Sequence, residues 1–156
     1  MSSTILLLRH AEEASEEGSM DLSAGGRRRA TRLANYLPRE FGPPHALFVA
    51  EPSGASVRCY LTLRPLADAL ALRIDGSYKA REFGLLAWKL LADPELANKT
   101  IVVCWSHTDL PALATALGVV GGDFPRRWKD ETFNLIFRLT HKQRGSTKAK
   151  SFVQPF

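Results

Sequence analysis

Two polar dipeptides interrupt the most apolar stretches of this sequence. Arg9 and His10 follow the apolar run at residues 5–8, and a second histidine, His107, comes soon after the apolar run at residues 100–105. A short continuous apolar run is typical of a strand that is covered on both faces in a parallel sheet. Because the carboxyl ends of such strands line the ligand crevice, we expect both histidines on one edge of the molecule.

These residue types suit the binding and transfer of a phosphoryl group. Such a group carries charge on three equatorial oxygens, so its site mainly needs correct positioning and cationic donors. Arg9 and Arg58 can supply forked, permanently charged contacts, and His107 can add another donor. A neutral His10 is a competent nucleophile, and nearby arginines disfavour its protonation. One ring nitrogen can then attack phosphorus while a hydrogen bond holds the other.

The rest of the chain predicts the elements that position these residues. Helical periodicity covers residues 21–38, 56–72, 81–94 and 109–118, and further strands are predicted at 46–50 and 132–140, with 150–156 able to return beside the last one. Pro38 is expected to end the first helix, and Pro65 to kink or break the second. Ile74 fits either a short strand or a turn, and Asp109 is expected to cap the last helix.

Strands that alternate with helices predict an α/β fold with three layers, α/β/α. The central sheet is expected to be mainly parallel, with a C-terminal antiparallel edge strand or hairpin. The basic stretch "HKQRGSTKAK", residues 141–150, is read as the exposed tip of that hairpin. With no internal repeat or linker, residues 1–156 are expected to form a single domain.

The ordered set of motifs resembles the histidine phosphatase superfamily, which includes the cofactor-dependent phosphoglycerate mutases. "LLLRHAEE" is similar to its Arg-His signature, and "DLSAGGRRRA" to the stretch that opens its first helix. "SVRCYLTLRPLA" is similar to its second arginine motif, here with Ser56, Arg58 and Thr62. "VVCWSHTDLPALATALG" supplies the second histidine, and "RWKDETFNLIFRL" resembles the closing strand of small members.

The resemblance implies a phosphatase that forms a phosphohistidine intermediate on His10, which water then hydrolyses. It assigns catalytic roles to His10, His107 and Glu82, and phosphate binding to Arg9 and Arg58. No metal and no cofactor are implied. The partner would be a phosphorylated small molecule or a phosphoprotein.

The general acid is the least determined of these roles. Family members commonly use a carboxylate after the third strand to protonate the leaving oxygen, and "AREFG" places Glu82 in that region. Glu82 can equally be an ordinary exposed glutamate of an amphipathic helix. Asp109, two residues after His107, is the alternative carboxylate.

Two departures from the family pattern argue against a mutase. Ala11 replaces the usual glycine after Arg-His, and "AEEASEEGSM" lacks the Trp-Asn part of the mutase signature. The chain is also short of long insertions, so we expect a shallow, open site that suits a phosphate on a protein side chain or a modest phosphomonoester. The first alternative is a noncatalytic binder of phosphate or of a phosphoprotein. A mutase is the less favoured alternative. Glutamates that point into such a site would discourage multiply phosphorylated ligands, and the candidates are Glu12, Glu13, Glu16 and Glu17.

Charge and cysteine content narrow the cellular setting. The formal charge of +5 arises from clusters at residues 27–32 and 142–150, without interleaved aromatics or a docking motif, so nucleic-acid binding is not predicted. Cys59 and Cys104 lack metal-ligand spacing and are expected to be buried free thiols. A reducing, cytoplasmic setting fits them. No segment is long and apolar enough for a signal peptide or a membrane span, and the oligomeric state is left open.

Overall fold

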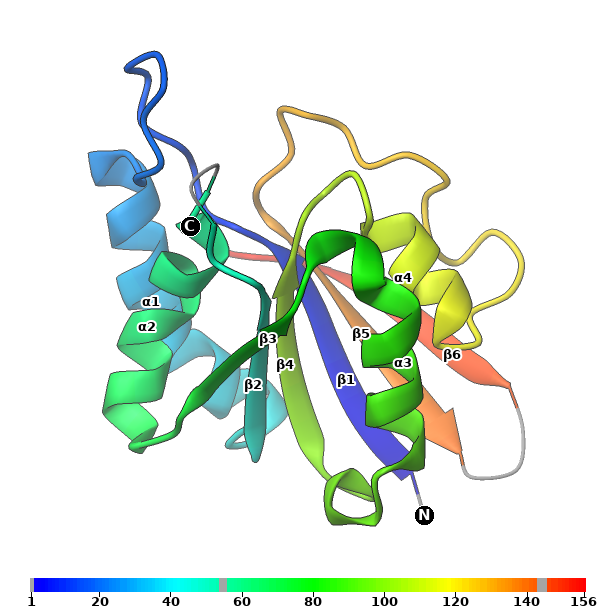
Figure 1. The fold of residues 1–156 in the computed structure, drawn as a ribbon. Helices are drawn as coiled ribbons and strands as arrows, with labels where there is room; N and C mark the ends of the chain where they lie inside the picture. The colour runs from blue at the N-terminus through cyan, green and yellow to red at the C-terminus, as the bar shows by residue number, and fades with distance from the viewer. Residues whose placement is uncertain (1, 54–55, 143–145) are drawn as a thin grey trace.

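One six-stranded sheet organises the molecule (Figure 1). The computed structural model describes residues 2–53, 56–142 and 146–156. The sheet has the order β3-β2-β4-β1-β5-β6, in which the first four are parallel and the last two antiparallel. Its strands are β1 (Ser2–Arg9), β2 (Ala46–Ala50), β3 (Ile74–Tyr78), β4 (Thr100–Trp105), β5 (Leu135–Lys142) and β6 (Thr147–Val153). The predicted mainly parallel sheet with C-terminal antiparallel strands is confirmed, although residues 143–145 of the expected hairpin tip lie outside the described residues.

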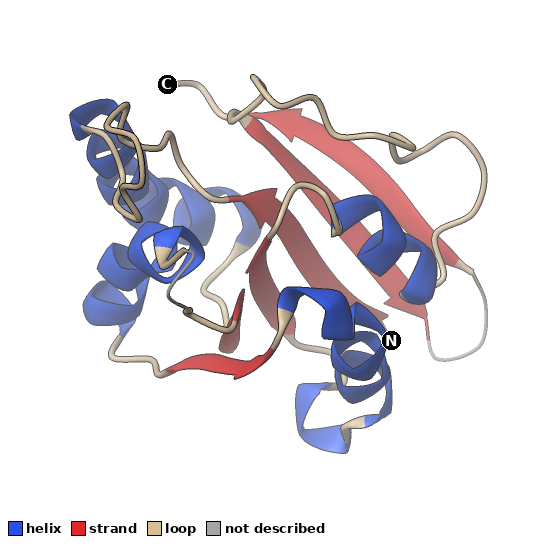
Figure 2. Cartoon of the chain, turned by 45° about the horizontal axis from the view of Figure 1, so that its top comes forward, coloured by secondary structure: helices blue, strands red, loops and turns tan. Residues whose placement is uncertain are grey.

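Helices cover both faces of the sheet, which gives the three predicted layers (Figures 1 and 2). The helices α1 and α2 pack on one face, and α3 and α4 on the other. Their bounds are α1 (Ala24–Phe41), α2 (Arg58–Leu70), α3 (Phe83–Ala92) and α4 (Leu110–Ala116), with short 3₁₀ turns η1 (Ala80–Glu82) and η2 (Pro94–Leu96). None of the described helices combines the length and apolar composition that crossing a membrane requires.

The side chains of β1 are buried on both faces of the sheet. Its side chains alternate, so Leu7 packs into the core under α3 and α4, whereas Leu6 and Leu8 pack into the core under α1 and α2. All three leucines are fully buried. The continuous apolar run, which predicted a strand covered on both faces, therefore contributes side chains to two hydrophobic cores.

Pro38 does not end the first helix, and Pro65 does not break the second, so both of these expectations were wrong; a kink at Pro65 stays a prediction. The helix α1 continues through Pro38 to Phe41 and ends before Gly42, whose φ of 86° is the left-handed conformation that glycine adopts readily. The helix α2 runs without a break through Pro65. In α2 the buried leucines Leu63 and Leu66 flank Pro65 and hold the helix against the core. In α1 the buried Leu33 and Leu37 do so before Pro38. In each helix this burial offsets one lost backbone hydrogen bond.

Two further local expectations are settled by the sheet and by α4. Ile74 begins β3, an edge strand whose polar sequence "IDGSY" concealed its pairing with β2. Asp109 does occupy the N-cap position of α4, but its side chain makes no capping hydrogen bond. Its carboxyl group is therefore not engaged in capping the helix.

The strand register brings distant parts of the chain to one edge. β1 and β4 are parallel neighbours with Arg9 opposite Trp105, so the residues that follow each strand emerge side by side. β5 runs antiparallel to β1, and its first residues therefore start at the same edge. In Figure 1 the loops after β1 and β4 and the loop before β5 all gather at the top of the view.

Candidate active site

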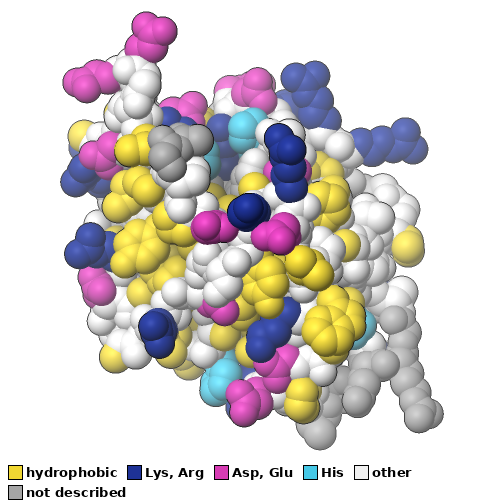
Figure 3. All heavy atoms as spheres, in the orientation of Figure 1, with side chains coloured by type: hydrophobic (Ala, Val, Ile, Leu, Met, Phe, Trp, Pro, Cys, Tyr) yellow, Lys and Arg dark blue, Asp and Glu magenta, His cyan; other side chains and the backbone are white. Residues whose placement is uncertain are grey.

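A cleft of about 500 Å³ opens at this edge of the sheet. Four of the five residues predicted for the site line it, namely Arg9, His10, Arg58 and His107. Acidic, basic and histidine side chains gather at the corresponding end of the surface (Figure 3). The cleft therefore unites residues from β1, α2 and the loop after β4, which lie up to 98 positions apart in the sequence, from Arg9 to His107.

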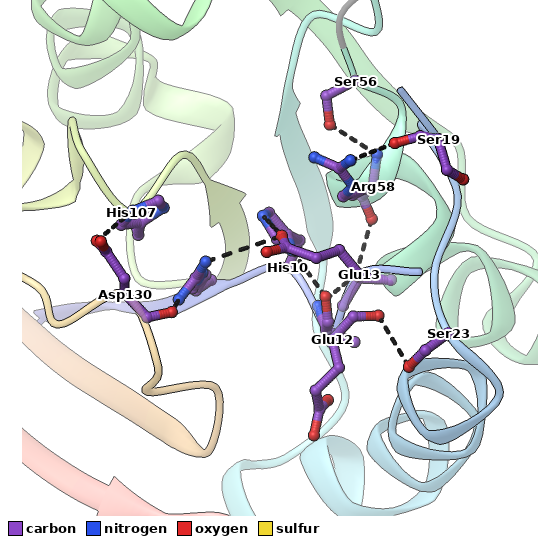
Figure 4. Close-up of polar contacts among 12 residues, drawn as sticks. His10, Glu12, Glu13, Ser19, Ser23, Ser56, Arg58, His107 and Asp130 are labelled. Carbon is purple, nitrogen blue, oxygen red and sulfur yellow. Dashed lines mark hydrogen bonds and ion pairs between the residues drawn. The ribbon is translucent and has the colours of Figure 1, made fainter. Parts of the chain in front are cut away.

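His10 has one ring nitrogen engaged and one available (Figure 4). Nδ1 lies 2.7 Å from the carbonyl oxygen of Ala11, and because a carbonyl only accepts, Nδ1 carries the proton. Burial lowers the pKa of His10 below its ordinary value of 6.5, and the charges of Arg9 and Arg58 lower it further. In the neutral ring Nε2 then keeps its lone pair, as a nucleophile requires.

Arg9 is a buried cation that is held by backbone and by an aromatic ring. Its Nη1 donates to the carbonyl oxygens of Asp130 and Thr132, and its guanidinium carbon lies 3.9 Å from the ring centroid of Phe133. Its Nε is buried and has no hydrogen-bond partner among the described residues. A buried charged donor without a partner is unusual, and a bound anion is one of the groups that can satisfy it.

Arg58 repeats this pattern from the first turn of α2. Its Nη2 donates to the carbonyl oxygen of Ser19, which fixes the guanidinium beside the loop that follows β1. Its Nε is also buried and, within the described part of the chain, unpartnered. Two such guanidinium groups in the wall of one cleft make it suitable for an oxyanion.

His107 is oriented by an aspartate that the sequence did not single out. Its Nε2 donates to Oδ1 of Asp130 at 3.1 Å, while the main chain of Asp130 accepts from Arg9. Asp130 thus links the two sides of the cleft. Asp130 lies in the loop before the antiparallel strand β5. For that reason neither its distance along the chain from the other site residues nor its neighbours in "RWKDETF" marked it as a site residue.

Helix termini fix the loop that carries His10. The hydroxyl of Thr62 in α2 accepts from the Ala11 N–H at 2.9 Å and donates to the Arg58 carbonyl at 2.8 Å. At the start of α1, Ser23 N–H donates to the Glu12 carbonyl at 2.9 Å. Ala11, which replaces the usual glycine, is fully buried in a small apolar cluster beside these contacts.

Glu82 is the predicted site residue that does not line the cleft. Its Oε1 accepts from the Lys79 N–H at 2.9 Å and so caps η1, although Ala80 in the same turn does border the cleft. Asp109 also lies outside the lining. Burial raises the pKa of Asp109, and Arg81 and hydrogen bonding with Ser106 oppose that shift.

Of the four glutamates after Arg-His, one faces the cleft. Glu12 pairs with Arg29 of α1 through two contacts of 2.8 and 3.1 Å and does not line the cleft. Glu16 and Glu17 are exposed and do not line the cleft. Glu13 lines it, with Oε2 at 3.7 Å from His10 Nε2 and 4.0 Å from Arg9 Nη2.

The thiols and possible metal ligands complete the inventory. Cys59 and Cys104 are free and buried, as expected. Among the described residues, no group of three or more His, Cys, Asp or Glu side chains is arranged to hold a metal ion.

Comparison with known proteins identifies the fold. No protein-family model and no curated protein matches the chain. A mycobacterial glucosyl-3-phosphoglycerate phosphatase is similar in structure, with a TM-score of 0.68, 16% sequence identity and 99% of each chain covered. The protein histidine phosphatase SixA, solved with tungstate, gives a TM-score of 0.66 at 18% identity over 96% of each chain. A phosphoglycerate mutase from Plasmodium falciparum gives 0.55 at 13% identity, covering 100% of this chain and 94% of the other.

Proposed function

We propose that this chain, which has the fold of the histidine phosphatases, is a phosphatase that hydrolyses phosphomonoesters or phosphohistidine through a phosphohistidine intermediate on His10. One observation carries the proposal. A neutral imidazole with a free Nε2 shares a cleft with two guanidinium groups whose buried Nε donors lack partners in the described chain. No metal or cofactor is part of the proposed mechanism.

The first step transfers the phosphoryl group to the protein. His10 Nε2 forms a bond to phosphorus while the bond between phosphorus and the leaving oxygen or nitrogen breaks, and a general acid protonates the leaving atom. Arg9 and Arg58 neutralise the charge on the equatorial oxygens, and His107 adds a hydrogen-bond donor to them. In the second step the oxygen of a water bonds to phosphorus and its proton passes to the carboxylate that acted as the acid, the bond between phosphorus and Nε2 breaks, and inorganic phosphate leaves.

Glu82 remains our predicted general acid, although its carboxylate must release the Lys79 N–H to act. Asp109 is the second candidate, because a raised pKa keeps a carboxyl group protonated at higher pH, as a proton donor requires.

The cleft and the similar structures support a proposal on the class of substrate. A glucosyl-3-phosphoglycerate phosphatase was solved with inorganic phosphate and SixA with tungstate, which supports an oxyanion site here. We propose a phosphorylated small molecule or phosphoprotein as partner, with no role for nucleic acid or membrane. We further propose that residues 1–156 act as a single domain in the cytoplasm, where free buried thiols persist.

The placement of Glu82 outside the cleft favours a second candidate, a noncatalytic phosphate or phosphoprotein binder. Such a protein would keep the arginine pocket but lack an effective acid. A mutase ranks below both, because Ala11 and the missing Trp-Asn depart from its signature.

Turnover of an aryl phosphate separates these candidates. We expect hydrolysis by the wild type, loss of activity by at least 100-fold in His10→Ala, and unchanged activity in His45→Ala, whose histidine is exposed and lies outside the cleft. Acid-labile phosphate trapped on the wild type and absent from His10→Ala would locate the intermediate. Phosphate binding without turnover would establish the binder instead.

Leaving-group dependence identifies the acid. An aryl phosphate needs little protonation of its leaving oxygen, whereas an alkyl phosphate needs it strongly. We therefore expect Glu82→Gln to reduce alkyl phosphate turnover selectively. If Asp109→Asn shows that selectivity and Glu82→Gln does not, the role belongs to Asp109.

A further inference from the structure

The lining of the cleft is electrostatically mixed, which is unusual for a site that must accept an anion. Its charged groups are the two guanidiniums of Arg9 and Arg58 and the three carboxylates of Glu13, Glu51 and Asp130. Asp130 is occupied by His107. Of the carboxylates that line the cleft, Glu13 is the one that reaches both the nucleophile and its neighbouring arginine (Figure 4).

The carboxylate of Glu13 lies where a phosphoryl oxygen would be needed. Its Oε2 is 3.7 Å from His10 Nε2 and 4.0 Å from Arg9 Nη2. A phosphorus atom that is about to bond to Nε2 must approach within about 3 to 3.5 Å, so its oxygens and this carboxylate would compete for the same space and the same cation.

The contact is weak enough to be displaced. Since Nδ1 of the neutral His10 holds the proton, Nε2 has none to donate to Glu13, and 3.7 Å exceeds a hydrogen bond. The Glu13 side chain is 44% exposed and can turn toward solvent. Its backbone is fixed by a bridge to Leu22 and by the neighbouring hydrogen bond from Ala14 N–H to the Asp21 carbonyl, so the carboxylate returns to the same mouth of the cleft.

We propose that Glu13 is a charge-selecting residue, an internal anion that competes with the phosphoryl group for Arg9 and His10. This inference rests on the proposed phosphoryl site and adds a selectivity to it. An incoming anion must displace the carboxylate and then remain beside its negative charge. Ligands with additional anionic groups, such as pyrophosphate, are penalised more than inorganic phosphate.

Calorimetric titration with inorganic phosphate and with pyrophosphate tests the proposal. Glu13→Gln keeps the shape of the side chain and removes its charge, whereas Glu16→Gln removes a charge from the exposed part of the same loop and is the matched control. We expect phosphate to bind Glu13→Gln roughly tenfold more tightly than the wild type, and pyrophosphate to gain more than that. Glu16→Gln should change either affinity by less than about twofold.

Kinetics provide the second readout. With an aryl phosphate, Glu13→Gln should lower KM without raising kcat, because it relieves competition for binding. Unchanged or weaker phosphate binding in Glu13→Gln, or an equal gain in Glu16→Gln, would overturn the proposal. A loss of kcat with unchanged binding would make Glu13 a proton donor instead and would also overturn it.

The same preparations separate this inference from the proposed function. Turnover by the wild type without any gain in Glu13→Gln refutes the role of Glu13 and leaves the phosphatase intact. If neither protein binds phosphate or turns over the ester, the phosphoryl site itself is refuted.

Discussion

The chemistry proposed for His10 depends on how one imidazole ring is held. The Ala11 carbonyl fixes the proton on Nδ1, and burial is the main cause of the lowered pKa, with Arg9 as a further contribution. From the sequence we attributed the neutral ring to the arginines alone. The structure adds the burial of His10, only 7% exposed at the end of β1, as the larger cause.

The lowered pKa of His10 has a defined consequence for activity. A nucleophilic imidazole loses reactivity as pH falls through its own pKa, and here that pKa lies below 6.5. We therefore expect more than half of the His10 rings to be neutral at pH 6.5, with the midpoint of the acid limb of kcat/KM below that pH. Ring-nitrogen NMR measures both the titration and the tautomer. A midpoint at or above 6.5, or a proton on Nε2 of the neutral ring, would contradict this.

Asp130 should act on catalysis through His107. Replacing it by asparagine removes the carboxylate that accepts from His107 Nε2, at a side chain that is 74% exposed. We expect kcat on an aryl phosphate to fall about tenfold, equivalent to ~1.4 kcal/mol, with little change in folding stability. Asp123→Asn, an exposed aspartate in the same connecting segment, is the control. Equal effects of the two substitutions would exclude an orienting role for Asp130.

At the level of elements, residues near the starts of α1 and α2 hold the loop after β1 by hydrogen bonds to its backbone. Thr62 in α2 holds the Ala11 N–H, and the beginning of α1 meets the Glu12 carbonyl. The second contact depends on a glycine. A Cβ on Gly26 would lie 2.2 Å from the Glu12 carbonyl oxygen, whereas a Cβ on Gly25 would meet nothing closer than 3.7 Å.

These two glycines give a matched pair of substitutions. We expect Gly26→Ala to lower the free energy of unfolding by about 1–3 kcal/mol, since α1 and the His10 loop must move apart, and to reduce the proposed turnover of an aryl phosphate with it. Gly25→Ala should be neutral or slightly stabilising, because alanine favours the helix. Urea unfolding measures both. Equal stability of the two variants would mean that the close approach at Gly26 does not constrain the loop.

At the scale of the whole molecule, the order of the strands in the sheet brings the residues of the site to one edge. The buried parallel strands were predictable because their apolar runs are continuous, and the positions of Arg9, His10 and His107 followed from strand ends. Arg58, in the first turn of α2, was found only through the resemblance of its motif. β3 was not predictable, because an edge strand needs little apolar sequence. Asp130 was also missed, because only the antiparallel pairing of β5 with β1 brings its loop to the cleft. Pro38, and the break expected at Pro65, were misleading because core packing outweighed the local effect of each proline.

Because the strands contribute side chains to the hydrophobic cores on both faces of the sheet, we expect the two cores to unfold in one cooperative transition. We expect Leu8→Ala, in the core under α1 and α2, to cost about 2–5 kcal/mol. The near-ultraviolet circular dichroism of Trp105 and Trp128, which belong to the opposite core, should shift together with the far-ultraviolet signal. Leu85→Ala, at a leucine that is 56% exposed, is the control. Separate transitions for the two signals would contradict a single cooperative domain.

The two thiols differ in their accessibility, and only the more accessible one lies in the cleft. Cys59 forms part of its wall and is 8% exposed, whereas Cys104 is fully buried and burial raises the pKa of its thiol well above the ordinary value. A small alkylating reagent should therefore modify Cys59 first in the native protein, and an anion that fills the cleft should slow that labelling. A fluorophore or spin label can thus be attached at the cleft itself without introducing any new cysteine.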